Sequence, residues 1–200
     1  MLRPILVAYS TCTGSTGEVA EFIAGEFRHA GLDVEVARMC DLNDFRRYSA
    51  AILGAPIYLG KLPAETGDFL KRYRSHIALL PTWFYALGPI RGKPWEYRNA
   101  REHALSWLKD FPWLEVENFK IFGGRFNPKQ MPFPYNLATQ LPASPLKGHP
   151  MTDVRNWKDI RAWASSIEEE YCRRYNIEGL TMRLNGELIR KGGLGIQVSA

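Results

Sequence analysis

The sequence has few of the residues on which metal sites, disulfide frameworks and membrane spans depend. Of its 200 residues, three are cysteine and four are histidine. Cys12, Cys40 and Cys172 are odd in number and widely spaced, which indicates reduced thiols rather than a disulfide framework or a zinc site. No apolar run approaches the roughly 20 residues that cross a bilayer. We therefore expect no metal centre and no membrane span.

Other absent features bear on the cellular location and on the partners of the protein. The first apolar segment begins almost at the first residue, which leaves no room for a signal peptide, so we expect a cytoplasmic protein. Peripheral contact with the inner face of the membrane stays open as an alternative. The net charge is +5 and the pI is near 9.2, but the basic residues are scattered and no nucleic-acid motif is present. We expect no nucleic-acid partner, and we read the basic residues as solvated helix faces or as an aid in meeting an anionic partner.

Five short apolar segments alternate with segments of helical periodicity. With 46% apolar residues the chain can bury a substantial core, and this alternation predicts an α/β fold, in which a parallel sheet has helices on both faces. The expected strands are 5–8, 34–37, 50–54, 83–87 and 119–122. The expected helices are 15–30, 64–73, 100–109 and 153–175.

The segment Ile5 to Thr16 is the most informative part of the chain. An apolar strand ends there in a loop of hydroxyl residues and glycine, and the loop leads into a helix. The first N–H groups of a helix lack internal partners, and the helix dipole favours an anion at that point. The predicted phosphate-binding residues are Ser10, Thr11, Cys12, Thr13, Gly14, Ser15 and Thr16. The alternative is that these residues only cap the helix.

The composition of this loop restricts the kind of phosphate group. It contains no Lys or Arg, unlike the loops that bind nucleoside triphosphates, and it has only Gly14 and Gly17 in place of the three glycines of a dinucleotide turn. A single phosphate monoester held by neutral donors fits this loop better than a nucleoside triphosphate or a dinucleotide does. Cys12 lies at the helix start, where thiol pKa values are lowered, so a redox role is one interpretation of this residue. The alternative is a filling role, in which a small side chain simply occupies a tight loop.

The loops after the third, fourth and fifth strands meet the phosphate loop at one edge of the predicted sheet, where ligands of such sheets bind. They are rich in Gly and Pro, and Tyr58 is placed to stack on a planar ring. These features indicate a planar cofactor with one phosphate, and FMN is such a cofactor. The alternative for Tyr58 is a place in the core.

At this point the residues carry a resemblance. STCTGST is similar to the phosphate loop of flavodoxins, T-x-T-G-x-T, with Thr11, Thr13, Gly14 and Thr16 at the matching positions. LGAPIYLGKLP, FGGRFNP and DVRNWKDIRAW resemble the flavodoxin-domain group that includes menaquinone-dependent protoporphyrinogen IX dehydrogenases. The resemblance covers about residues 4 to 175. It implies a flavodoxin-like three-layer sandwich with a five-stranded parallel sheet of order 2-1-3-4-5 and FMN at the switch point.

The resemblance also implies roles for residues outside the phosphate loop. The residues expected to flank the isoalloxazine are Ala55, Pro56, Ile57, Tyr58, Leu59 and Gly60. Those expected to contact its pyrimidine side are Leu87, Gly88, Pro89 and Ile90. Gly123, Gly124 and Arg125 are expected to border the substrate side.

These observations predict an FMN-dependent oxidoreductase that passes electrons between an organic donor and a quinone or another carrier. Because the chemistry occurs on the flavin, we expect no dedicated catalytic residue, and the four histidines read as surface residues. Arg91, Lys93 and Arg125 are candidates for attracting an anionic substrate such as a carboxylated porphyrin, or for structural ion pairs. The alternatives are a flavodoxin-type electron shuttle that docks on redox partner proteins, and a domain that has lost its flavin.

Two segments depart from the regular alternation. Asn127 to Pro150 is long and rich in Pro, and we expect a packed loop there, with an exposed binding lid as the alternative. The tail carries an Asn185-Gly186 pair between short runs, which is typical of a two-residue hairpin turn, although a disordered tail is the other interpretation. We therefore divide the chain into a flavodoxin-like FMN-binding domain, 1–176, and a C-terminal extension, 177–200.

Overall fold

The fold is taken from a computed structural model of the chain. The structure describes residues 3–58, 60–131, 133, 136–137, 141, 144, 146–177, 181–184 and 187–190, the last two ranges as backbone only.

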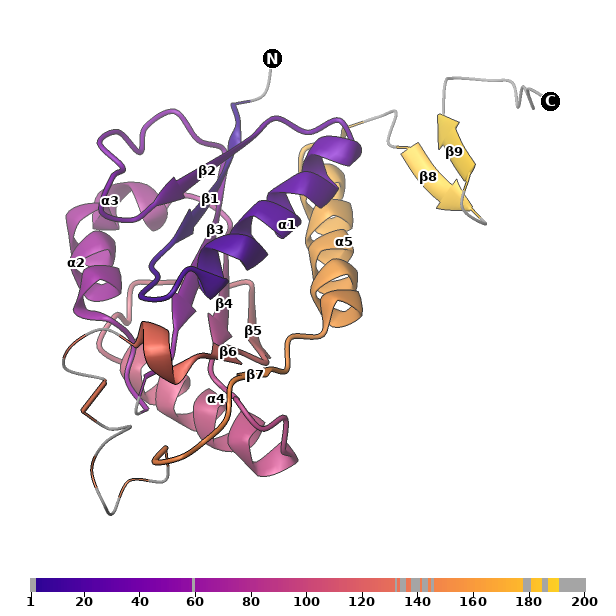
Figure 1. Cartoon of the computed structure of the whole chain (residues 1–200). Helices are drawn as coiled ribbons and strands as arrows, with labels where there is room; N and C mark the ends of the chain where they lie inside the picture. The colour runs from indigo at the N-terminus through magenta and orange to yellow at the C-terminus, as the bar shows by residue number, and fades with distance from the viewer. Residues whose placement is uncertain are drawn as a thin grey trace.

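A five-stranded parallel sheet of order β2-β1-β3-β4-β5 forms the centre of the protein (Figure 1). Its strands are β1 (Ile5–Tyr9), β2 (Val34–Arg38), β3 (Ala50–Pro56), β4 (Thr82–Leu87) and β5 (Asn118–Phe122). The three middle strands are buried on both faces, which explains why they read as continuous apolar runs in the sequence. The chain reverses its winding direction at β1, so β1 and β3 define the switch point of the sheet.

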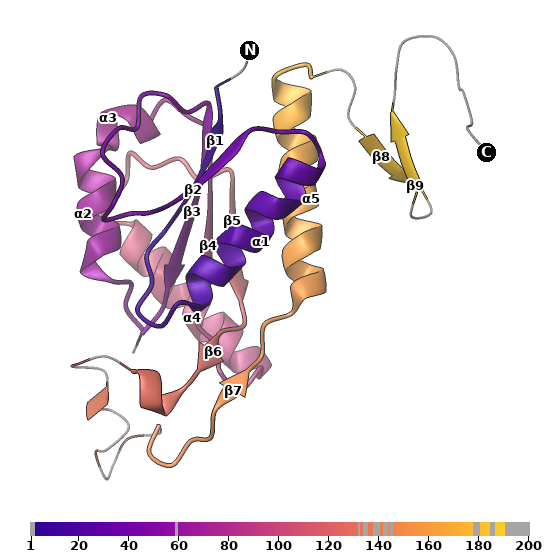
Figure 2. The ribbon, with the colours of Figure 1, turned by 45° about the horizontal axis from the view of Figure 1, so that its top comes forward.

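Helices cover both faces of the sheet (Figure 2). On one face lie α1 (Ser15–His29) and α5 (Trp157–Arg174), and on the other lie α2 (Ala64–Arg72), α3 (Arg74–Ile77) and α4 (Pro94–Leu108). Two buried clusters result. One joins Val7 and Trp83 to α1 and α5, and the other joins Leu6 and Phe84 to the opposite helices. The predicted fold class and strand order are confirmed.

Two predicted helix starts are wrong. Helix α4 begins at Pro94, six residues before the expected start, because proline suits the first position of a helix and the Glu96 carboxylate accepts from the Lys93 N–H at 3.4 Å. Helix α5 begins at Trp157 instead of Asp153, because the Asn156 side chain caps it by accepting from the backbone N–H groups of Lys158 and Asp159.

A small antiparallel ribbon was not predicted. Strand β6 (Arg125–Phe126) pairs with β7 (Thr152–Asp153), and together they bring the two ends of the long loop back beside the sheet. Each strand has only two residues, too few for an alternation pattern to appear in the sequence. A short 3₁₀ helix, η1 (Pro128–Gln130), follows β6.

The long loop is less packed than we expected. Phe133, Leu137 and Leu141 are 77%, 45% and 57% exposed, so the packed-loop expectation is wrong for these side chains. Met131 and Leu146 are half-buried, and both line the pocket described below. The loop thus presents apolar side chains to the outside near the ligand-binding edge of the sheet.

The C-terminal segment contains strands β8 (Thr181–Leu184) and β9 (Glu187–Arg190), which pair antiparallel. Their register, with Leu184 opposite Glu187, agrees with a two-residue connection. The predicted turn residues, Asn185 and Gly186, lie outside the described residues.

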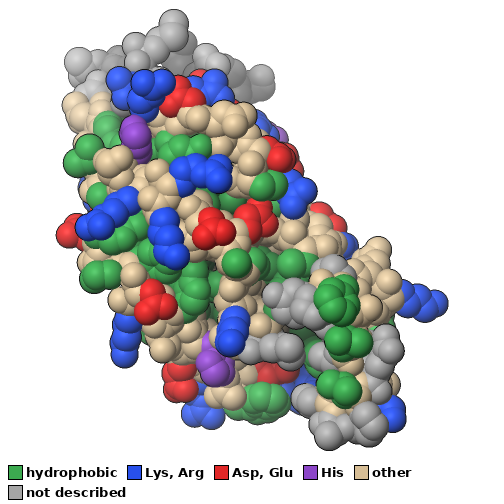
Figure 3. Space-filling model, turned by 90° about the vertical axis from the view of Figure 1, so that its left-hand side faces the viewer, with side chains coloured by type: hydrophobic (Ala, Val, Ile, Leu, Met, Phe, Trp, Pro, Cys, Tyr) green, Lys and Arg blue, Asp and Glu red, His purple; other side chains and the backbone are tan. Residues whose placement is uncertain are grey.

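The described residues carry neither a helix long and apolar enough to cross a membrane nor a group of three His, Cys, Asp or Glu placed to hold a metal ion. On the face shown in Figure 3, Lys and Arg side chains are interspersed with Asp and Glu.

Candidate functional site

The phosphate loop joins β1 to α1, as the sequence predicts. Gly14 stands at the N-cap of α1 with a φ of +88°, a left-handed conformation that glycine adopts without a steric penalty. Its N–H donates to the Thr11 hydroxyl at 2.9 Å. A Cβ added to Gly14 would meet no atom within 4 Å beyond the adjoining chain, so the Cβ position faces open space.

Buried residues fix the base of this loop. The Ser10 hydroxyl is fully buried and shares a hydrogen bond of 2.8 Å with the Thr66 hydroxyl of α2. The buried Tyr85 hydroxyl donates to the Thr16 carbonyl at 3.2 Å. Gly54 makes room for the Tyr85 ring, since a Cβ there would lie 2.2 Å from its Cζ. Contacts with α2 and β4 therefore fix the position of the loop.

Cys12 is half-buried within the loop. Burial raises the pKa of its thiol, and the neighbouring Glu65 carboxylate acts in the same direction. Since the thiolate is the reactive form of cysteine, this environment favours the filling role over a redox role.

The loop after β3 forms a tight turn beside the phosphate loop. The Tyr58 N–H donates to the Lys61 carbonyl at 2.8 Å, the Lys61 N–H returns a bond of 2.9 Å, and Gly60 has a φ of +77°. The Tyr58 hydroxyl lies 3.4 Å from the Thr13 hydroxyl. The His103 ring of α4 lies beneath this turn, 3.3 Å from a Cβ built on Gly60.

A pocket of about 450 Å³ opens where these loops meet, within the size range of small-molecule sites. The predicted site residues that line it are Ser15, Pro56, Ile57, Tyr58, Gly60, Leu87, Gly88, Ile90, Gly124 and Arg125. Most residues of three predicted groups, 55–60, 87–90 and 123–125, therefore line one pocket. The phosphate loop adds only Ser15.

The other predicted residues lie around the pocket. Those not among its lining residues are Ser10, Thr11, Cys12, Thr13, Gly14, Thr16, Ala55, Pro89 and Gly123. Ala55 is buried in β3, and Gly123 packs against the Val154 backbone. Leu59 lies outside the described residues.

Sequence reasoning missed part of the pocket. The additional lining residues are Trp95, Glu96, His103, Phe126, Met131 and Leu146. Trp95 and Glu96 lie in α4 before its expected start, His103 lies within the expected helix, and the other three come from β6 and the long loop. The Pro94 helix start was the sequence signal that would have found Trp95 and Glu96.

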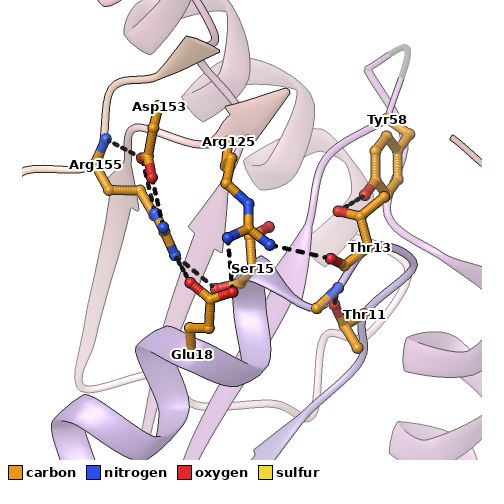
Figure 4. Close-up of polar contacts among 9 residues, drawn as sticks. Thr11, Thr13, Ser15, Glu18, Tyr58, Arg125, Asp153 and Arg155 are labelled. Atoms are coloured by element: carbon orange, nitrogen blue, oxygen red, sulfur yellow. Dashed lines mark hydrogen bonds and ion pairs between the residues drawn. The ribbon is translucent and has the colours of Figure 1, made fainter. Parts of the chain in front are cut away.

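An ion-pair network borders the phosphate loop (Figure 4). The Arg125 guanidinium lies 2.8 Å from the Glu18 carboxylate of α1 and donates to the Thr13 carbonyl at 3.4 Å. Arg155 lies 2.8 Å from the second Glu18 oxygen and also pairs with Asp153 of β7. The Arg155 side chain is only 4% exposed and its guanidinium lies 4.8 Å from the centre of the Trp157 ring.

This network predicts a pH effect. Hydrogen bonds from the Arg155 side chain hold the pKa of Asp153 below its usual value, against the opposing effect of partial burial. A lowered pKa in the folded state stabilises the fold at pH values above the unfolded pKa of about 3.9, and this contribution is lost as the pH falls through the folded pKa. Asp153→Asn should therefore lower the free energy of unfolding near neutral pH, and its difference from the wild type should shrink below about pH 4. Urea unfolding from about pH 7 to pH 2 measures this, and a constant difference would contradict it.

The residues present fit FMN. Neutral hydroxyl and backbone donors surround the helix N-terminus, and the buried Thr16 Oγ1 has no hydrogen-bond partner among the described residues. A pocket with apolar walls and Tyr58 lies beside them. A phosphate at the helix N-terminus and a flat ring between the loops use both features.

Comparison with known proteins agrees with this geometry. The sequence model of a family described as "Flavodoxin domain" matches residues 6–153. The protoporphyrinogen IX dehydrogenase (quinone) of Escherichia coli strain K12 is 26% identical over an alignment of 112 residues, which covers 54% of this chain and 61% of that protein. The chain thus spans about three fifths of the length of this relative.

Solved structures share the fold. Oxidised Flavodoxin 1 from Bacillus cereus superposes with a TM-score of 0.51 at 17% identity, covering 83% of this chain and 97% of that chain. The rubredoxin:oxygen oxidoreductase of Desulfovibrio gigas gives 0.52 at 13% identity, covering 88% of this chain and 38% of that one. Together with the family match over residues 6–153, the strand order and the phosphate loop, this shows that the chain belongs to the flavodoxin domain family.

Proposed function

We propose that the protein is an FMN-dependent oxidoreductase that passes electrons from an organic donor to a quinone. The observation that carries the proposal is the pocket, which joins the predicted flavin loops to an apolar wall of Trp95, Phe126, Met131 and Leu146. A protein that only shuttles electrons to a partner does not need such a wall beyond its cofactor. The similarity to a protein named protoporphyrinogen IX dehydrogenase (quinone) also supports a quinone as the electron acceptor.

In this proposal FMN supplies the redox chemistry, and the chain supplies binding and orientation. The loop Ser10 to Thr16 holds the phosphate, and residues 55–60 and 87–90 hold the ring. The Tyr58 ring contributes stacking, and its hydroxyl is held near Thr13. Apolar side chains keep water away from the reacting edge.

The charges of the pocket favour a neutral acceptor. Among its described lining residues the ionised side chains are Glu96 and Arg125. The Glu96 carboxylate accepts from the Arg91 N–H at 2.9 Å, and Arg125 is paired with Glu18. Both charged groups of the pocket therefore already have partners, and a quinone ring needs mainly apolar contact.

Trp95→Ala should separate acceptor binding from cofactor binding. We expect the KM for a soluble quinone to rise about fivefold to tenfold, because burial of a large aromatic surface against the acceptor is lost, while FMN affinity changes less than twofold. Steady-state quinone reduction and flavin fluorescence titration measure these two quantities. The matched control is Leu105→Ala, which removes a similarly exposed apolar side chain of α4 that does not line the pocket. Equal effects of the two substitutions would refute the proposed acceptor wall.

The second candidate is an electron shuttle without its own substrate, which the fold alone allows. A purified, FMN-loaded protein that reduces no quinone but exchanges electrons with a redox partner protein would favour it. Failure to bind FMN at all would refute both candidates.

A further inference from the structure

The phosphate loop contains no basic residue, but a cation reaches it from a distant part of the chain. Arg125 in β6 donates to the carbonyl of Thr13, the loop residue that precedes Gly14. Figure 4 shows its guanidinium between Glu18 and Thr13, over Ser15. The positive charge that the loop lacks in sequence is therefore present beside it in space.

The surroundings strengthen the effect of this charge. The Arg125 side chain is 27% exposed and lines the pocket. Partly buried charges are screened by salt less than exposed ones, so they act more strongly on a ligand nearby. A guanidinium also binds phosphate with directed, charge-assisted hydrogen bonds.

The negative charge of Glu18 disfavours an anion at this helix N-terminus, and the ion-pair network compensates that charge. The Glu18 carboxylate would repel a phosphate, but Arg125 and Arg155 each pair with one of its oxygens. Arg155 also pairs with Asp153. The two guanidinium groups and the two carboxylates sum to zero charge, so the network leaves no uncompensated negative charge beside the loop.

We propose that Arg125 binds the phosphate of the flavin, and that Glu18 and Arg155 are positioning residues that hold its guanidinium over the loop. This inference rests on the proposed function. A guanidinium has five N–H donors, so Arg125 can donate to a phosphate oxygen and keep its bond to Glu18. Arg155, nearly fully buried against Trp157, fixes the second oxygen of Glu18.

Riboflavin, which has the same ring system as FMN but no phosphate, makes the test specific. Titrating each flavin with the flavin-free protein and following flavin fluorescence gives both affinities without measuring activity. In Arg125→Gln we expect the Kd for FMN to rise at least about tenfold, equivalent to about 1.4 kcal/mol, while the Kd for riboflavin changes less than twofold. Arg161→Gln is the matched control, because Arg161 also pairs with a carboxylate of α1, Glu26, away from the loop.

Two further variants test the parts of the proposal. Arg125→Lys keeps the charge and should retain part of the preference for FMN. Arg125→Gln leaves Glu18 with one cation fewer, so the double variant Glu18→Gln/Arg125→Gln should recover at least about threefold of the lost FMN affinity. A double variant as weak as Arg125→Gln would refute the charge compensation assigned to Glu18.

The outcomes separate this inference from the proposed function. If the wild type binds neither flavin, the proposed function fails. If the wild type binds FMN and Arg125→Gln keeps the full preference for FMN over riboflavin, only this inference fails, and a carboxylate on a substrate becomes the remaining anionic ligand for Arg125. Equal loss of both flavins would show a structural effect and would also overturn the assignment. Thermal unfolding of each flavin-free variant checks that the fold is retained.

Discussion

Gly14→Val should weaken FMN binding by more than about 100-fold, which corresponds to about 2.8 kcal/mol. Two effects add up. The φ of +88° at Gly14 is strained for a β-branched residue, and relief of that strain would turn the backbone N–H groups away from the phosphate. The added side chain would also extend into the open space at the Cβ position beside the loop, where no atom beyond the adjoining chain lies within 4 Å. Flavin fluorescence titration measures the loss.

Gly31→Val provides a matched control for this substitution. Gly31 follows the other end of the same helix, has a φ of +82°, and likewise has no atom within 4 Å of a built Cβ. Both variants should lose stability by a similar amount, because the backbone strain is similar. FMN affinity should fall only in Gly14→Val. A comparable loss in both variants would place the effect on the fold rather than on the anion site.

The sequence predicts the central sheet well because its strands are buried on both faces. Burial on both faces selects continuous apolar runs, and these runs are visible without any knowledge of their neighbours. The phosphate loop is predictable for a similar reason, since the strand, the hydroxyl cluster and the helix are contiguous in the chain. Its neutral donors and Gly14 are set by local backbone geometry.

The outer half of the pocket is not predictable in this way. Trp95 and Glu96 reach it because α4 starts earlier than its periodicity suggests, and Phe126 and Met131 reach it from a two-residue strand and an irregular loop. The electrostatics of the loop are also non-local. The spacing between Glu18 and Arg125 in the chain carries no signal that they form an ion pair, which depends on how the β6–β7 ribbon packs.

Gly123→Ala tests that packing and should lower the free energy of unfolding by about 3 kcal/mol or more, since overpacking against rigid atoms is costly. A Cβ on Gly123 would lie 2.1 Å from the carbonyl oxygen of Val154 and 3.0 Å from the Tyr97 hydroxyl. The oxygen belongs to the backbone and cannot rotate away, so the segment leading to α5 must move. For a chain of this length we expect the Tm to fall by about 6 to 12 °C, which calorimetry or circular dichroism would measure.

The neighbouring Gly124→Ala serves as the control, because the nearest atom to its Cβ is the Pro89 oxygen at 3.4 Å. We expect a Tm change of less than about 3 °C there. Gly123→Ala should in addition reduce the preference for FMN over riboflavin, because Gly123 sets the close approach of the chain that carries Asp153 and Arg155, and these residues hold Glu18 and hence Arg125 in place. Equal stability of the two variants would contradict the close approach at Val154. A destabilised Gly123→Ala that keeps its full flavin preference would instead show that Arg125 is positioned without the ribbon.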